Sequence, residues 1–384
     1  MMAVLCWDCT GSRSAVEKTT ENGIEVVING TKPVLLEGEP SKLTLEKTWI
    51  IDTEDDAVAA LGITDIQDFD IDNEGNIVIL RPPTGRGRCI YKLSPKGKLL
   101  AAFGQLGQGP NEMEYPNAVV VRDNGEIWAL DSPKNKIYIF NEDGRPISEK
   151  SPIKFDTITP LGNGKFLVLR LDATDLTKKF LPQVIELYDS QFHLLKELDR
   201  SMSYANRTIY ERIPESYVNG IQFIFTGKVS RECISIGNSE RGYEISVFDI
   251  EGRPVRKIRK KFSSVPVTEE YKNKYLKNYL EFMPEYAKKI YFPKNWHAFH
   301  AFLPDEDGRL FVMTYEPGNA PGEYIYDIFN REGIFIARTS INALHRLDVG
   351  GYVLARIRSD VLYVVQEKPS GFKQICAYKM IWQY

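Results

Sequence analysis

The amino-acid sequence predicts an all-β protein, a six-bladed β-propeller whose blades each contain four antiparallel strands. The first observation is a recurring unit: an alternating apolar run, a tight turn of Asp, Asn and Gly, and a second β-rich run. Its clearest copy spans residues 103–140, and weaker copies begin near Asp68, Phe299 and Tyr352. A unit repeated in this way is typical of a propeller blade. The second observation is an aromatic surplus of 20 Tyr and 19 Phe in 384 residues, because aromatic side chains favour strands.

Each repeat divides into four strands joined by short connections. In the first three blades the expected strands are 66–71, 77–80, 90–93 and 99–103; 118–122, 127–130, 137–140 and 146–149; and 155–161, 166–171, 184–188 and 193–198. In the fourth and fifth blades they are 221–226, 233–236, 245–249 and 254–258, and then 297–303, 310–314, 324–329 and 334–338. Turns such as Asp123-Asn124-Gly125 supply the positive-φ residues that tight hairpins require.

The last blade lacks one strand. Residues 352–358, 362–367 and 374–381 supply three strands, and the unassigned strand-like run is residues 42–51 (KLTLEKTWII). We expect this run to add as the outermost strand of the last blade, because ring closure leaves no long unpaired edge. The propeller then covers residues 42–384, and residues 1–41 are expected to form a tail or tether.

Residues 103–140 resemble the NHL repeat. The matching residues are Phe103, Gly104, Gly107, Gly109, Pro116, Asp123, Gly125, Ile127, Asp131 and the strand at 136–140. Over about residues 24–384 the chain is similar to the bacterial six-bladed β-propeller family related to NHL proteins, which are often exported lipoproteins. The resemblance implies a fold and a binding role, and it supplies no catalytic residues.

The N-terminal sequence, MMAVLCWDCTGSRS, bears on the compartment. It has neither the basic n-region nor the roughly 7–15 apolar residues of a secretory signal. Lipidation at Cys9 would call for small residues before it, yet Trp7 and Asp8 precede it. We expect a periplasmic or cell-surface protein with Cys9 as the candidate lipidation site, because residues 10–22 have the polar composition of a tether. A cytoplasmic protein with a frayed tail is the alternative.

Charge and cysteine content narrow the set of partners. A net charge of −3 gives no case for nucleic acid as a partner. No run approaches the roughly 20 apolar residues that span a bilayer. The cysteines at positions 6, 9, 89, 233 and 376 fit neither a zinc site nor a disulfide framework. We expect no cofactor, no metal ion and a monomer.

Loop length points to one face of the ring. In an up-and-down blade, the turns between the first and second and between the third and fourth strands lie on one face, here called the short-turn face. The other connections lie on the opposite, long-loop face. The long segments belong to the latter: 81–88, 104–116, 172–182, 199–218, 259–296 and 316–323. Because long loops on a rigid scaffold concentrate binding residues, we expect the ligand site there, around the channel mouth.

The segment 259–296 is expected to be an insertion that contains a helix at about 268–290. Thr268 can cap the helix, and Tyr271, Tyr275 and Tyr279 fall on one face. That face either packs on the blades below or forms a lid or docking surface for a partner.

Basic residues recur in the same loops and favour an anionic ligand, with a solvated charged rim as the alternative. They are Arg86, Arg88, Lys178, Lys179, Arg207, Arg212, Arg259, Lys260 and Lys261. The candidate ligand contacts are Arg86, Arg88, Tyr210, Arg212, Trp296, His297 and His300.

His297 and His300, beside Trp296, are the best candidates for chemistry. On a strand, residues three apart point to opposite faces, so regular geometry does not let both bind one metal ion. His193 and His345 are expected on outer strands and exposed. The run from Asp70 to Gly75 is similar to a calcium loop but lacks the closing Glu, so it is expected to be a hairpin turn. The sequence has no GxSxG elbow and no HExxH motif.

Three functions remain open. The first is a non-enzymatic propeller that binds a small molecule, a glycan or a protein at the long-loop face. The second is a metal-dependent lyase or hydrolase that uses His297, His300 and nearby carboxylates. The third is a structural protein that docks through the insertion. No catalytic residue is assigned.

Overall fold

A computed structural model describes residues 16–172, 181–201, 218–221, 223–281, 283–345 and 351–384. Three residues with predicted roles, Cys9, Tyr210 and Arg212, lie outside this part of the chain. Lys178, Lys179 and Arg207 of the predicted basic mouth also lie outside it.

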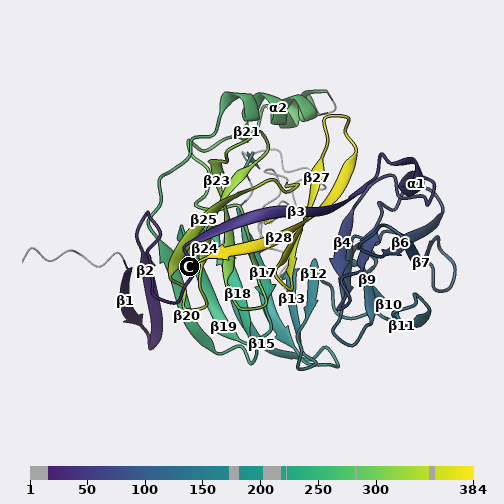
Figure 1. Ribbon diagram of the computed structural model, residues 1–384, viewed down its shortest axis with the longest axis horizontal. Helices are drawn as coiled ribbons and strands as arrows, with labels where there is room; N and C mark the ends of the chain where they lie inside the picture. Colours follow the sequence, from purple (N-terminus) through teal and green to yellow (C-terminus); the bar gives the residue numbers. More distant parts are fainter. Residues whose placement is uncertain (1–15, 173–180, 202–217, 222, 282, 346–350) are drawn as a thin grey trace, which may run out of the picture.

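The described residues form six blades of antiparallel strands arranged in a ring, which confirms the predicted fold (Figure 1). Blades 1 and 2 are β4 (Asp68–Ile71), β5 (Ile77–Leu80), β6 (Gly87–Leu93) and β7 (Leu99–Leu106), then β8 (Ala118–Val121), β9 (Ile127–Asp131), β10 (Lys136–Phe140) and β11 (Pro146–Lys150). Blades 3 and 4 are β12 (Thr157–Pro160), β13 (Phe166–Leu171), β14 (Gln183–Tyr188) and β15 (Leu194–Arg200), then β17 (Phe225–Val229), β18 (Cys233–Asn238), β19 (Glu244–Asp249) and β20 (Pro254–Lys260). Blades 5 and 6 are β22 (Ala301–Pro304), β23 (Leu310–Pro317), β24 (Tyr324–Phe329) and β25 (Phe335–Ile341), then β26 (Ala355–Arg358), β27 (Val361–Glu367), β28 (Lys373–Gln383) and β3 (Lys42–Asp52).

The ring closes as predicted. Strand β3 pairs antiparallel with β28, from Lys42 opposite Gln383 to Asp52 opposite Gln374. In Figure 1 the two strands run side by side across the front of the molecule. Because β3 and β28 come from opposite ends of the sequence, this pairing joins both ends of the chain in one blade.

The insertion between blades 4 and 5 contains the predicted helix. Helices α2 (Glu269–Leu280) and α3 (Pro284–Ala287) follow one another, and α2 lies at the top of the view in Figure 1. Thr268 caps α2, because its side chain accepts a hydrogen bond from the backbone N–H of Tyr271. A short parallel pair, β16 (Val218–Asn219) and β21 (Ile290–Tyr291), lies below α2. Within the residues that the structure describes, the other helical segments are α1 (Asp56–Ala59) and single 3₁₀ turns at Ser132–Lys134 and Ser239–Arg241.

The predicted tail over residues 1–41 is wrong for residues 16–29. Strands β1 (Val16–Glu21) and β2 (Ile24–Asn29) form a hairpin, and β2 pairs parallel with β20. Blade 4 therefore has six strands, in the order β1-β2-β20-β19-β18-β17. The hairpin lies at the left of Figure 1, outside β20.

A side-chain hydrogen bond closes tight turns on the short-turn face of several blades. The first residue of the turn, Asp or Asn, accepts a hydrogen bond from the backbone N–H four residues later. The pairs are Asp72 with Asn76 (2.8 Å), Asn141 with Arg145 (2.8 Å), Asp189 with His193 (2.8 Å), Asp249 with Arg253 (2.9 Å), Asp305 with Arg309 (2.8 Å) and Asn330 with Ile334 (2.9 Å). Glycines such as Gly75 and Gly333 precede the donor at φ of 79° and 76°, a region in which glycine meets no steric penalty.

Asn29 attaches the N-terminal hairpin to blade 5. Its Nδ2 donates to the carbonyl oxygens of Gly333 (2.9 Å) and Arg259 (3.1 Å), and its Oδ1 accepts from the backbone N–H of Phe335 (2.8 Å). Asn29 is buried, so water cannot replace these partners. One side chain thus satisfies backbone groups of both blade 4 and blade 5.

We predict that Asn29→Ala lowers the free energy of unfolding by about 1–3 kcal/mol, because it leaves buried backbone groups without partners. Chemical denaturation measures the effect, provided that the slope of the unfolding free energy against denaturant concentration is the same in both proteins. Thr20→Ala, at an exposed position of the same hairpin, is the control and should cost less than about 1 kcal/mol. Equal effects of the two substitutions would contradict this role of Asn29.

Candidate functional site

His300 is a buried structural residue. It precedes β22 rather than lying in it, and its side chain has no exposed surface. Its Nδ1 lies 3.3 Å from the hydroxyl oxygen of Tyr315, and its Nε2 lies 3.1 Å from the carbonyl oxygen of Tyr352. Both ring nitrogens are therefore engaged within the protein, and neither is available to a metal ion in this arrangement.

The other histidines do not assemble a catalytic group around His300. His297 also precedes β22, so the predicted strand over 297–303 begins too early. His345 packs against His300 and Tyr324, with ring centroids 6.0 and 4.6 Å apart, so its predicted place on an exposed outer strand is wrong. Burial lowers the pKa of His345. Among the described residues, no group of three or more His, Cys, Asp or Glu side chains could hold a metal ion.

Trp296 packs beneath α2. Its ring stacks on Tyr315 at 4.6 Å and meets Tyr271 of α2 edge-on at 4.6 Å. Phe292 and Tyr275 extend the same aromatic cluster. The face of α2 that carries the tyrosines therefore packs on the propeller, and Trp296 is only 8% exposed. Ligand contact by Trp296 would require the insertion to move.

Arg86 and Arg88 lie in blade 1, and no contact in the described part of the chain brings them to the aromatic cluster under α2. Both side chains are exposed. The loop is held by Arg81, whose guanidinium donates to the carbonyl oxygens of Arg88 (2.7 Å) and Arg86 (3.0 Å). The guanidinium of Arg88 donates to the carbonyl of Ala102.

Two residues of the predicted basic mouth have other roles. Arg259 pairs with Glu244 at 2.6 Å and with Glu21 of the N-terminal hairpin. Lys260 is buried and lies 3.2 Å from Asp327 of blade 5. Arg259 thus joins blade 4 to the N-terminal hairpin, and Lys260 joins blade 4 to blade 5.

The structure has a cleft between blades 4 and 5 that the sequence did not indicate. It has a volume of about 690 Å³ and opens on the short-turn face. Its walls are the turn before β18, the turn between β22 and β23, the turn between β24 and β25, and the start of β20. This volume is in the range of pockets that hold small ligands or a few residues of a peptide.

Apolar side chains form the floor of the cleft. They are Cys233, Val247, Val255, Ile258, Pro304 and Leu310. Ile258 and Leu310 are buried, whereas Val255 is 41% exposed at the edge. Burial raises the pKa of the Cys233 thiol.

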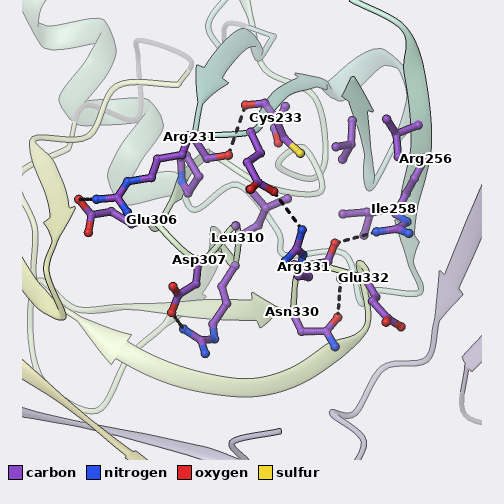
Figure 2. A pocket seen from close by; sticks show the side chains of 18 of the residues that line it. Arg231, Cys233, Arg256, Ile258, Glu306, Asp307, Leu310, Asn330, Arg331 and Glu332 are labelled. Atoms are coloured by element: carbon purple, nitrogen blue, oxygen red, sulfur yellow. Dashed lines mark hydrogen bonds and ion pairs between the residues drawn. The ribbon is translucent and has the colours of Figure 1, made fainter. Parts of the chain in front are cut away.

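Charged side chains surround this floor, as Figure 2 shows. Arg231 pairs with Glu306 at 3.4 Å, and Arg331 pairs with Glu232 at 3.0 Å. The side chains of Arg231 and Arg331 are 71% and 70% exposed, so each pair contributes little to stability, about 0–1 kcal/mol. A charged group of a ligand can therefore replace one partner in either ion pair at a low cost in free energy.

A second, smaller pocket of about 240 Å³ lies between blades 1 and 2 on the same face. Its lining is mostly polar, and Asp72, which forms part of it, pairs with Lys92 at 2.9 Å. Asp72 also accepts the turn hydrogen bond from Asn76, so its carboxylate is already satisfied. The predicted hairpin turn after Asp70 is confirmed.

Comparisons with known proteins support the fold and nothing finer. No family model matches the chain, and no curated protein matches it. A solved structure from Bacteroides fragilis, described provisionally as an exported protein, is 12% identical with a TM-score of 0.52, and the match covers 94% of this chain and 100% of that one. A member of the DUF4221 family from Bacteroides vulgatus is 12% identical (TM-score 0.48; 90% and 100% covered), and virginiamycin B lyase from Staphylococcus aureus is 10% identical (TM-score 0.42; 88% and 100% covered).

This chain is a six-bladed β-propeller. The resemblance to NHL repeats stays a prediction, because no family model matches. None of the described helices is long and apolar enough to cross a membrane.

Proposed function

We propose that this protein is a non-enzymatic binding propeller and that the cleft between blades 4 and 5 binds a short peptide segment of a partner protein. The observation that supports it is the combination, in one cleft of about 690 Å³, of an apolar floor and a rim of exchangeable ion pairs. The floor can take one or two apolar side chains, and the rim can pair with charged ones.

The lining favours a peptide over other ligands. It contains no aromatic side chain, and aromatic rings are the usual platforms for sugars and bases. Four arginines alternate with five acidic residues: Arg231, Arg256, Arg309 and Arg331, with Glu39, Glu232, Glu306, Asp307 and Glu332. This mixed charge does not attract a polyanion, whereas a peptide can offer both signs.

The enzyme hypothesis receives less support. It depended on His297 and His300, and His300 has both ring nitrogens engaged by Tyr315 and Tyr352. The long-loop face remains the second candidate for a docking surface, because Leu280, Met283 and Tyr291 of the insertion are exposed there. Substituting Leu280 and Met283 by Ser tests that face without touching the packed tyrosines.

We also propose a periplasmic or cell-surface location. The supporting observation is the fold shared with a Bacteroides fragilis protein described provisionally as exported. A lipid anchor at Cys9 belongs to the same proposal, and mass spectrometry of the N-terminal peptide from cells tests it.

The test of the cleft begins with a displayed library of random peptides selected on the wild-type protein. We predict that selected peptides share a pattern of apolar and charged residues, and that Val255→Asp weakens their binding at least about ten-fold. A carboxylate at this edge disrupts the apolar contact, and a ten-fold loss corresponds to about 1.4 kcal/mol. Equilibrium titration of a labelled peptide measures the change.

Ile147→Asp is the matched control. Ile147 follows Pro146 at the start of β11, as Val255 follows Pro254 at the start of β20, and it is 55% exposed outside the cleft. Its substitution should leave peptide affinity unchanged. Failure to select any peptide, or equal loss in both variants, would refute the proposed function.

A further inference from the structure

The arginines of the cleft between blades 4 and 5 are all paired, whereas its carboxylates are not. Each of the four arginines in the lining lies within ion-pair distance of an acidic side chain. The pairs are Arg231 with Glu306 (3.4 Å), Arg331 with Glu232 (3.0 Å), Arg309 with Asp307 (2.8 Å) and Arg256 with Glu25 of the N-terminal hairpin (2.7 Å). Among the described residues, these pairs leave two carboxylates of the lining, those of Glu39 and Glu332, without an arginine partner.

Glu39 is held in position without a counter-charge. The buried side chain of Asn330 donates from Nδ2 to Oε1 of Glu39 at 2.8 Å, and its Oδ1 accepts from the backbone N–H of Glu332 at 3.1 Å. No lysine or arginine in the described part of the chain pairs with Glu39. The carboxylate of Glu332 lies 3.6 Å from Lys18, which also pairs with Glu25 at 3.4 Å. The two carboxylates therefore share one exposed cation at most.

These two carboxylates lie beside the apolar floor. The turn that contains Asn330 and Glu332 packs on β20, because a Cβ atom on Gly333 would lie 2.7 Å from Cγ1 of Ile258. Ile258 is a buried residue of the floor, and Figure 2 shows Asn330 and Glu332 at the same side of the cleft. A peptide that places an apolar side chain on the floor therefore brings a neighbouring residue close to Glu39 and Glu332.

An acidic and a basic side chain of a ligand would meet different costs in this cleft. An incoming carboxylate must displace Glu306 or Glu232 from its arginine, whereas an incoming cation can pair with Glu39 and break no existing pair. Given the proposed peptide-binding function, on which this inference rests, we propose that the bound peptide carries a Lys or Arg next to an apolar residue. Glu39 binds the cationic group, and the charge of Glu332 reinforces this contact.

Two displayed peptide libraries of equal size test the sign of the charge. In one library Lys and Arg are the only charged residues, and in the other Asp and Glu are. The basic library should yield peptides that bind in the cleft, which is shown by protection of Cys233, in its floor, from a small neutral alkylating reagent. The best peptides of the acidic library should bind about ten-fold more weakly or not at all.

Glu39→Gln tests the assigned carboxylate, because Gln keeps an acceptor for Asn330 and removes the charge. Titration of a selected basic peptide should show an affinity about three- to ten-fold lower than in the wild type. The same peptide with Gln in place of its basic residue should bind both proteins equally. Glu37→Gln is the matched control, because Glu37 is exposed two residues earlier and does not line the cleft. It should leave the affinity unchanged.

The possible failures separate the charge of the ligand from the function of the cleft. Acidic peptides that bind as tightly as basic ones and protect Cys233, or equal effects of Glu39→Gln and Glu37→Gln, would overturn the assigned charge and leave the cleft as a peptide site. No binder from either library, or binders that leave Cys233 unprotected, would overturn both proposals.

Discussion

Replacing Asp327 by Ala is expected to lower the free energy of unfolding by about 3–5 kcal/mol. Asp327 of β24 has no exposed surface and lies 3.2 Å from Lys260 of β20, which is also buried. It accepts from the Tyr243 hydroxyl at 2.8 Å and from Arg338 at 2.8 Å. The substitution leaves the buried Lys260 ammonium without its carboxylate, and an uncompensated buried charge is among the most costly defects in a protein interior.

Chemical denaturation of Asp327→Ala and of the control Asp123→Ala measures this effect. Asp123 lies 3.5 Å from Arg358 on the surface, and its side chain is 87% exposed, so its loss should cost less than about 1 kcal/mol. Asp327→Asn keeps an acceptor without the charge and should fall between the two. The network around Asp327 joins blades 4 and 5 in the interior. If Asp327→Ala lowers the free energy of unfolding no more than Asp123→Ala does, these blades are held together in another way.

Deletion of residues 1–52 is expected to abolish cooperative unfolding. This deletion removes β3, the outermost strand of blade 6, together with the hairpin that extends blade 4. Strand β28 would then expose its backbone groups and the apolar side chains that pack against Leu43 and Ile51. Because an unpaired edge of this length also promotes association, we expect aggregation along with the loss of fixed tertiary structure.

Deletion of residues 1–15 is the matched control and should leave the thermal transition unchanged within a few degrees. Near-ultraviolet circular dichroism and thermal denaturation compare the two variants. A protein lacking residues 1–52 that still unfolds in one sharp transition near the wild-type temperature would contradict the role of β3 in closing the ring.

Ring closure could be predicted because it followed from a local strand-like pattern and from the number of strands in each blade. The run at residues 42–51 alternates as a strand does, and the last blade was one strand short. The hairpin at residues 16–29 was missed although a signal existed: Asn22-Gly23 precedes the β-rich run from Ile24, and both residues have positive φ. Its parallel pairing with β20 spans more than two hundred residues of sequence, and no local pattern specifies such a partner.

The candidate site was harder to predict than the fold. The cleft is the space left between two blades, and four separate segments form its walls, so no single motif encodes it. The innermost strand of blade 4 was predicted at residues 221–226, whereas the observed strand is Phe225–Val229. Trp296 was recognised as unusual, but sequence alone could not show that Tyr271 of α2 packs against it.

The rate of alkylation of Cys233 tests the binding function most directly, because this thiol lies in the floor of the cleft. A small neutral reagent is applied with and without a saturating amount of a selected peptide, and peptide mapping separates Cys233 from the other cysteines. Binding in the cleft predicts that modification of Cys233 slows about ten-fold or more at peptide concentrations well above Kd. An unchanged rate at Cys233 with the peptide fully bound would place the peptide elsewhere and contradict the account.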